Sequence, residues 1–277
     1  MLLRAIVFVI LAAACGGSSA PADRPIVFGG DARPATLHVP DNFVDDGTTY
    51  PLVVVLHGYS ATGFVQSAYF GMSPVPDGVF VIAPDGLVDS TGNQFWNADP
   101  ACCDFDHTGV DDSSYIGGLI DDVLAAWPID PGAVHVIGHS NGGYMAYRMA
   151  CDHADTIASI VVLAGASASD PSTCTPSQPV AVLHMHGTAD VTVPYNLAAP
   201  SVMQWAQYDT CMATQTPGPN LDIDTDVGAE TTTTTFNGCA TDAPVEFWSL
   251  QGAGHVPGLN PDFSTMILAY MAAHRRP

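Results

Sequence analysis

The chain contains no lysine. Its 277 residues include 28 aspartates and glutamates but only six basic residues, all of them arginine, so the formal net charge is −22. Binding to nucleic acid or to an anionic membrane surface depends on clustered lysine and arginine. The composition therefore makes nucleic acid a poor partner, and it is typical of a protein that stays soluble in salty or extracellular surroundings.

The apolar run at the start of the chain is short. Residues 1–14 contain Arg4 followed by apolar residues from Ala5 to Ala14. A basic first segment, an apolar middle and small residues at the end are typical of a secretory signal peptide, and this run is too short to cross a bilayer. We therefore predict that residues 1–14 are a signal peptide and take no part in the fold.

Cys15 follows this signal. Ala12 to Cys15 resembles a bacterial lipobox, and the glycines and serines of residues 16–19 resemble a flexible tether. Lipidation of Cys15 would anchor the protein to the outer membrane, although Ala12 stands where a lipobox usually has leucine. Ordinary cleavage at the same bond would release it instead. We expect either secretion or lipid anchoring to the bacterial cell envelope, with residues 15–34 as the tether.

Cysteine is also scarce, with seven residues in the chain. Apart from Cys15 the number is even, which in an exported protein favours disulfides. Cys211 and Cys239 flank a threonine-rich stretch and are expected to join its ends. No Cys-x2-Cys pair supports the alternative of a zinc site, so no metal is expected. The pairing of the remaining four is left open: Cys102, Cys103, Cys151 and Cys174.

The order of apolar runs predicts an α/β fold. Nearly half of the residues are hydrophobic, enough for one large core. Continuous apolar runs that end at glycine or turn residues are typical of buried parallel strands. With helices between them, the strands predict a doubly wound, mostly parallel sheet with helices on both faces, in a single domain over residues 35–277. The predicted strands cover about 52–56, 79–83, 134–137, 160–165, 180–187 and 245–250, and the helices 113–127, 144–151, 198–208 and 261–274.

One segment shows neither the helical nor the strand periodicity of apolar residues. Residues 214–243 are rich in Thr, Asp, Gly and Pro and are expected to form an excursion between sheet elements. Residues 222–226 begin like a calcium loop, but Val227 replaces the glycine that such a loop needs. Thr233 stands where the bidentate glutamate belongs, which argues against calcium.

The pattern Gly138-x-Ser140-x-Gly142 lies between a predicted strand and a predicted helix. A serine hydroxyl that attacks a carbonyl carbon must protrude from a sharp turn, and flanking glycines let the neighbouring backbone approach without a Cβ clash. The strand before it and the helix after it make the pattern more specific than the five residues alone. Ser140 is therefore the predicted nucleophile.

A serine nucleophile needs a base and a carboxylate that orients the base. In this fold they follow later strands, the acid first and the histidine second. Asp190 and His255 stand in that order, each just after a predicted strand. We expect the oxyanion donors to be the backbone amides of Asn141, which follows the nucleophile, and Tyr59, which follows an early strand. The Tyr59 ring could also form a wall of the acyl pocket.

Other polar residues have structural interpretations. His184 and His186 could form a metal pair, but on a buried strand they are more often structural. His57 is expected to organise its loop rather than act as a second base. Asp111 and Asp112 open a predicted helix and suit capping better than acid catalysis.

Several segments together resemble a known family. They are Leu56-His-Gly-Tyr59, the run from Gly138 to Arg148, the run from His186 to Tyr195, and Gly252-Ala-Gly-His255. The chain is similar in these segments to the polyhydroxybutyrate depolymerase and feruloyl esterase-like α/β-hydrolases, of the carbohydrate esterase family 1 type. The resemblance covers most of the chain after about residue 35. It also includes Trp96-Asn97, Cys102-Cys103, residues 109–112, and Cys211 with the turn at Gly238-Cys239.

The resemblance implies a serine esterase with no metal or organic cofactor and with its triad at Ser140, Asp190 and His255. His57, Tyr59, Trp96 and His139 are expected to contact the substrate. The implied substrates are short hydroxyalkanoate esters, or feruloyl and acetyl esters of plant polysaccharide. Family members commonly have Thr-Trp-Pro-Gly after the catalytic histidine, whereas this chain has Val256-Pro-Gly. Without an appended adsorbing domain, we expect soluble oligomers or small esters as partners, and a monomer.

Two other functions fit the same residues. A serine peptidase uses the same triad on amides. A surface lipoprotein could retain the hydrolase fold for binding alone, because a fold does not fix a function. An acyl-enzyme esterase remains the principal prediction, since the triad and both oxyanion positions are present together.

Overall fold

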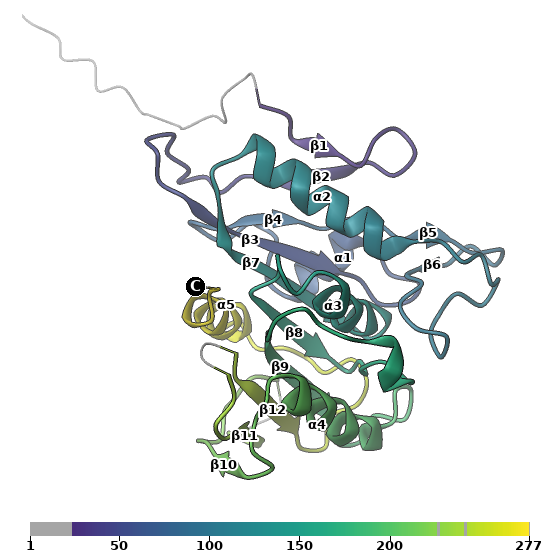
Figure 1. The fold of residues 1–277 in the computed structure, drawn as a ribbon, viewed down its shortest axis with the longest axis vertical. Helices are drawn as coiled ribbons and strands as arrows, with labels where there is room; N and C mark the ends of the chain where they lie inside the picture. Colours follow the sequence, from purple (N-terminus) through teal and green to yellow (C-terminus); the bar gives the residue numbers. More distant parts are fainter. Residues whose placement is uncertain (1–23, 226–227, 241–242, 277) are drawn as a thin grey trace, which may run out of the picture.

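The computed structural model describes residues 24–225, 228–240 and 243–276. The predicted signal peptide, Cys15 and the start of the predicted tether lie outside them, as do residues 226 and 227 of the calcium-like segment. The described chain forms one ten-stranded sheet in the order β1-β2-β4-β3-β7-β8-β9-β12-β11-β10, with helices on both of its faces (Figure 1). The predicted α/β-hydrolase fold class is confirmed.

The centre of the sheet is parallel. Every adjacent pair from β4 to β12 in the sheet order is parallel. Each of these strands is an apolar run whose residues are mostly buried, because helices cover both faces. These are the six strands predicted from sequence: β4 (Phe80–Ile82), β3 (Tyr50–Leu56), β7 (Ile129–His139), β8 (Ser159–Leu163), β9 (Ala181–Gly187) and β12 (Val245–Leu250).

The two edges of the sheet are antiparallel and were not predicted. On one edge, β1 (Val27–Phe28) pairs with β2 (Ala35–His38), which pairs with β4. The predicted tether boundary at residue 34 is therefore wrong, because β1 and the turn after it already belong to the folded sheet. On the other edge lie β11 (Thr231–Phe236) and β10 (Gln215–Pro217), both within the segment that showed no period.

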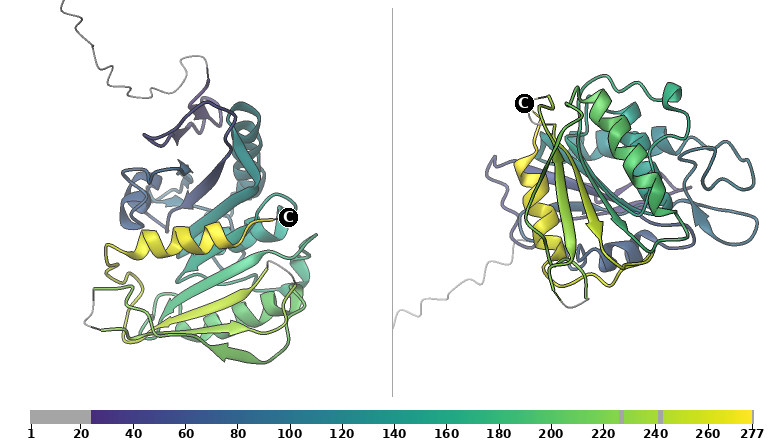
Figure 2. Two further views of the ribbon diagram at one scale, coloured as in Figure 1. Left: turned by 90° about the vertical axis from the view of Figure 1, so that its left-hand side faces the viewer. Right: turned by 90° about the horizontal axis from the view of Figure 1, so that it is seen from below.

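The helices form two layers. Helices α2 (Asp112–Ala126), α3 (Asn141–Asp152) and α4 (Ala198–Tyr208) share one apolar cluster with the sheet, and α5 (Phe263–Ala273) belongs to a second cluster. Figure 2 shows α5 and α4 on opposite sides of the strands. Four helices match the prediction, and α1 (Gly63–Tyr69) was missed. Shorter elements are the hairpin β5 (Leu87–Val88) and β6 (Gln94–Phe95), and the 3₁₀ turns η1 (Pro171–Thr173) and η2 (Tyr195–Leu197).

Three disulfides connect the described cysteines. Cys211 pairs with Cys239, as predicted, and joins the end of α4 to the turn after β11. Of the four left open, Cys151 pairs with Cys174 and the adjacent Cys102 and Cys103 pair with each other. Over the part of the chain that the structure describes, no helix combines the length and apolar character needed to traverse a membrane.

Candidate active site

Ser140 lies in a strained turn between β7 and α3. Its φ of 55° and ψ of −121° lie outside the regions that non-glycine residues prefer. A Cβ on Gly138 would approach the Gly142 carbonyl oxygen to 2.0 Å, and a Cβ on Gly142 would approach the Leu56 oxygen to 2.2 Å. Both glycines are therefore needed for the turn, as the sequence pattern predicted. The Ser140 amide is fixed by a 2.9 Å hydrogen bond to the Leu163 oxygen at the end of β8.

The three predicted triad residues meet at the carboxyl edge of the sheet. His255 Nε2 lies 2.9 Å from Ser140 Oγ, and His255 Nδ1 lies 2.7 Å from Asp190 Oδ2. The Asp190 side chain is fully buried, and that of His255 is 16% exposed. The imidazole can thus accept the serine proton at one nitrogen while the other donates to a carboxylate. This is the geometry that general-base activation of a serine requires.

Asp190 is held by several donors. Its Oδ1 accepts the amides of Thr192 at 2.8 Å and Val193 at 3.1 Å. His186 Nε2 lies 3.3 Å from Asp190 Oδ2 and 2.9 Å from the Val193 oxygen, to which it donates. These contacts fix the plane of the carboxylate in front of His255.

His184 and His186 of β9 form a buried hydrogen-bonded chain. With His186 donating through Nε2, its Nδ1 accepts from His184 Nε2 at 3.0 Å, and the Tyr147 hydroxyl donates to His184 Nδ1 at 2.8 Å. Burial lowers the pKa of both imidazoles, which favours their neutral forms. The prediction of a structural pair fits these contacts. Their link to Asp190 was missed, although His186 stands near the end of the strand that leads to the acid.

The predicted oxyanion residues flank the nucleophile. Asn141 is the first residue of α3, where helix amides have no intrahelical acceptor and the dipole favours negative charge. Tyr59 follows Gly58, whose position is so close to the elbow that a Cβ there would lie 3.4 Å from Ser140 Cβ. The Tyr59 ring is fixed by its hydroxyl, which donates to Asp89 at 2.5 Å, and it packs edge-on against Phe105.

Two of the predicted substrate contacts are wrong. His57 and Trp96 are fully buried and cannot meet a substrate in this arrangement. His57 Nδ1 donates to the Gly58 oxygen at 2.8 Å, and its Nε2 accepts the Gly86 amide at 2.8 Å. Trp96 Nε1 donates to the His57 oxygen at 3.0 Å. Both residues organise the loop before Tyr59, which is the role that the sequence indicated for His57 as the alternative to a second base.

The His139 side chain is buried against the loop that carries His255. It is 7% exposed, and its Nε2 donates to the His255 oxygen at 2.8 Å. Burial lowers its pKa to about 4, so at neutral pH the ring carries no charge beside His255. The Tyr69 hydroxyl, which sequence analysis did not identify, donates to the Pro257 oxygen at 2.7 Å and fixes the same loop. Asp111 caps α2 as predicted, accepting the Ser114 amide at 2.9 Å.

A groove lies beside the nucleophile helix. It has a volume of about 740 Å³ and lies between the loop after β8 and helix α4, with Tyr144 of α3 in its wall. Aromatic, apolar, hydroxyl and amide groups line it, and among the described residues that form its wall none is charged. Such a surface suits a neutral ligand rich in hydroxyl groups or carrying an aromatic ring.

Comparison with known proteins finds esterases among the relatives of this chain. "Putative esterase NocK" of Nocardia uniformis subsp. tsuyamanensis is 29% identical over 175 residues, covering 62% of this chain and 49% of that protein. Feruloyl esterase B of Piromyces equi is 26% identical over 249 residues, covering 82% of this chain and 43% of that protein. The chain thus spans about half the length of these two curated relatives.

The fold also has a counterpart among solved structures. Acetyl xylan esterase from Aspergillus awamori superposes with a TM-score of 0.67 at 18% identity, covering 87% of this chain and 94% of that one. In addition, residues 29–250 match the model of the Esterase family, described as "Putative esterase". Because this match runs from the turn before β2 to the end of β12, the chain belongs to this esterase family of α/β-hydrolases.

Proposed function

We propose that the protein is a serine carboxylic-ester hydrolase that works through an acyl-enzyme. One observation supports this most strongly. The Ser140 hydroxyl, the His255 imidazole and the Asp190 carboxylate form a continuous hydrogen-bonded array, with the serine on a strained, glycine-flanked turn. Family membership points to the same chemistry.

In the first step Ser140 Oγ attacks the ester carbonyl carbon while His255 Nε2 takes the hydroxyl proton. The Nδ1–H bond to Asp190 keeps the imidazole in the required tautomer and stabilises its cation. The backbone amides of Asn141 and Tyr59 donate hydrogen bonds to the carbonyl oxygen as negative charge develops on it. His255 then returns the proton to the departing alcohol, and the acyl group stays on Ser140. In the second step His255 activates a water that releases the acid.

The substrates that we propose are feruloyl or acetyl esters of plant polysaccharide. A feruloyl esterase is among the relatives, and an acetyl xylan esterase shares the fold. Tyr144 of the nucleophile helix stands in the wall of the uncharged groove between the β8 loop and α4; no triad residue is among the described residues that line this groove, and its hydroxyl and amide groups suit neutral sugar residues. Hydroxybutyrate oligomers are the alternative that the sequence resemblance raised. Rates on a feruloyl ester, acetylated xylan and a hydroxybutyrate trimer would rank them, and kcat/KM highest on the trimer would contradict the polysaccharide assignment.

We further propose that the protein is exported. Residues 1–14 have the form of a signal peptide, and Cys15 is the candidate site of lipidation. Replacing Cys15 by Ser should move the protein from the membrane fraction to the medium if the lipid is present. An unchanged distribution would favour simple secretion.

The direct test is the variant Ser140→Ala. Turnover of a nitrophenyl acetate should fall to background, because the variant lacks the hydroxyl that lies 2.9 Å from His255 Nε2. The exposed Ser177, changed to Ala, is the matched control and should keep wild-type kcat. Retained turnover in S140A with an unchanged melting temperature would overturn the proposed nucleophile. Comparing matched ester and anilide substrates separates an esterase from a peptidase.

A further inference from the structure

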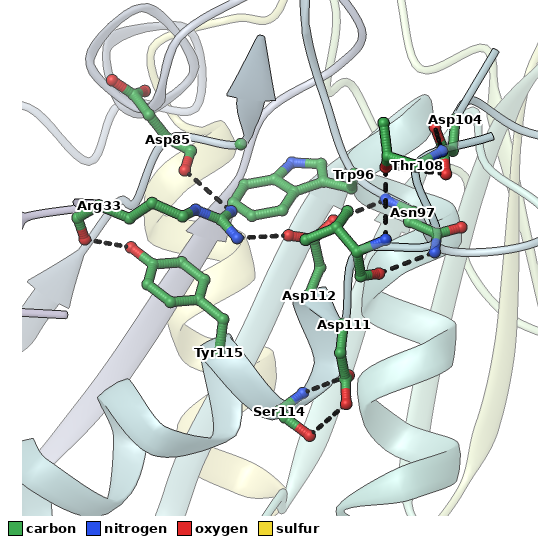
Figure 3. Close-up of polar contacts among 12 residues, drawn as sticks. Arg33, Asp85, Trp96, Asn97, Asp104, Thr108, Asp111, Asp112, Ser114 and Tyr115 are labelled. Carbon is green, nitrogen blue, oxygen red and sulfur yellow. Dashed lines mark hydrogen bonds and ion pairs between the residues drawn. The ribbon is translucent and has the colours of Figure 1, made fainter. Parts of the chain in front are cut away.

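Arg33 forms a buried cluster away from the triad. It lies in the turn between β1 and β2, and its Nη1 donates to Asp112 Oδ1 at 2.7 Å while Nη2 donates to the Asp85 carbonyl oxygen at 3.2 Å. The guanidinium carbon lies 3.8 Å from the centre of the Tyr115 ring. Only 13% of the Arg33 side chain is exposed, and the Asp112 side chain is fully buried. Figure 3 shows the guanidinium between Asp85 and Asp112.

From Asp112 a first chain of contacts leads to the nucleophile helix. The second carboxylate oxygen, Oδ2, accepts the Asn97 amide at 2.7 Å. The preceding residue, Trp96, has both its backbone amide and its carbonyl oxygen bonded to the side chain of Asn141. The Trp96 amide donates to Asn141 Oδ1 at 2.7 Å, and Asn141 Nδ2 donates to the Trp96 oxygen at 2.9 Å. These bonds fix Asn141, whose backbone amide directly follows Ser140.

From Asp85 a second chain leads to the other oxyanion amide. The peptide unit whose oxygen Arg33 binds also carries the Gly86 amide, which donates to His57 Nε2 at 2.8 Å. His57 Nδ1 in turn donates to the Gly58 oxygen, the carbonyl of the peptide unit that contains the Tyr59 amide. Trp96 Nε1 donates to the His57 oxygen at 3.0 Å and joins the two chains.

We propose that the Arg33–Asp112 pair is a positioning device for the oxyanion hole, which sets the backbone amides of Asn141 and Tyr59 relative to each other. The inference rests on the proposed function. Arg33 touches no reacting atom in this arrangement and acts through Asp85 and Asp112. A planar guanidinium can bind both acceptors at once because its donors diverge in a fixed fork, whereas a lysine ammonium is a point charge.

A structural role alone would not require this pair. A buried ion pair often stabilises a fold no better than apolar side chains of similar volume. Burial also raises the pKa of Asp112, which shows that the charged carboxylate is held there at a cost despite Arg33. Placement of the Asn141 and Tyr59 amides would explain why the Arg33–Asp112 pair is there, since displacement of oxyanion donors lowers the rate of the chemical step.

The experiment compares two variants with wild type. The double variant R33M/D112N removes both charges together and so avoids leaving an unpaired buried carboxylate. R33K keeps the charge and the contact to Asp112 but loses the fork. We expect kcat on a nitrophenyl ester to fall about 10- to 100-fold in R33M/D112N and about threefold to tenfold in R33K, with KM within about twofold of wild type. R24M, which removes the arginine of the more exposed ion pair Arg24–Asp45, is the control and should keep kcat.

A second readout reports on the oxyanion hole itself. A trifluoromethyl ketone inhibitor forms a hemiketal with Ser140 whose oxyanion sits in the hole, so its inhibition constant should rise by the same factor as kcat/KM falls. A folded variant in which melting temperature falls while kcat and inhibitor affinity stay at wild-type values would overturn the proposal. Failure of the proposed function is distinguishable, because in that case wild type would show no turnover or S140A would retain it.

Discussion

Two buried aspartates lie near opposite ends of β9 and have very different surroundings. Asp190, beyond the carboxyl end, accepts from two amides and from His255, and it lies beside His186. Asp209, near the amino end, accepts the Val180 amide at 3.2 Å, and its Oδ2 has no hydrogen-bond partner among the described residues. Burial raises the pKa of Asp209 to about 8. Both side chains lie in the interior, so the donors around them, rather than the degree of burial, distinguish the aspartate beside His255 from the aspartate near the other end of the strand.

The largest expected difference between the two aspartates is in kcat after each is replaced by asparagine. Asp190→Asn keeps the shape but presents an amide to His255 Nδ1, which favours the wrong tautomer. We expect kcat to fall by about 10⁴-fold with a small change in melting temperature. The matched variant Asp209→Asn should keep wild-type kcat. A loss of activity in D209N equal to that in D190N would mean that both act through general stability.

The surroundings of Asp209 can be tested by varying the pH. Asp209 has a pKa of about 8 in the folded chain and an ordinary value of 3.8. Between these values the native state binds one proton more than the unfolded state, so stability falls as pH rises, by up to about 1.4 kcal/mol per pH unit for this group. Asp209→Asn should remove that slope and stabilise the protein at alkaline pH.

Urea denaturation of wild type and D209N between about pH 5 and pH 9 would check this. The exposed Asp121, changed to Asn, is the control and should leave the slope in place. An unfolding free energy that depends on pH equally in D209N and wild type would contradict the pKa assigned to Asp209.

A smaller effect is expected from the imidazole behind Asp190. His186→Phe removes the donor to the Val193 oxygen and the acceptor for His184. We expect kcat to fall about tenfold because Asp190 loses part of its orientation, and stability to fall by about 2 kcal/mol because buried polar groups lose their partners. The control is His135→Phe, which removes a buried histidine bonded to Ser159 at the start of β8. It should lower stability without changing kcat, and an equal loss of kcat in both variants would assign His186 a structural role only.

Sequence predicted the parallel centre of the sheet and missed its edges for a physical reason. Strands buried on both faces, such as residues 52–56, must be continuous apolar runs and can be recognised one at a time. β11 consists of five threonines and a phenylalanine, and its pairing with β12 becomes evident only once the sheet is assembled. The sequence of β11 has no alternation of apolar and polar residues that would identify it as a strand on its own.

The residues of the candidate site also differ in how well they could be predicted from sequence. Ser140, Asp190 and His255 could be predicted as a triad because each lies next to a strand and the three stand in the order expected of an α/β-hydrolase. Arg33 was missed because it falls in a segment interpreted as a tether, although it is one of only six basic residues and the structure places it against a buried aspartate. His57 and Trp96 were assigned to the substrate because residue type and position in the chain do not reveal which way a side chain points.

The most direct test of the account is to identify the residue that a fluorophosphonate probe modifies. After labelling of the wild-type protein, peptide mass spectrometry should find a single adduct on Ser140, and labelling should be absent in S140A and strongly slowed in His255→Ala. An adduct on a different serine, or ester turnover that continues after Ser140 is fully modified, would contradict the central claim that this hydroxyl is the nucleophile.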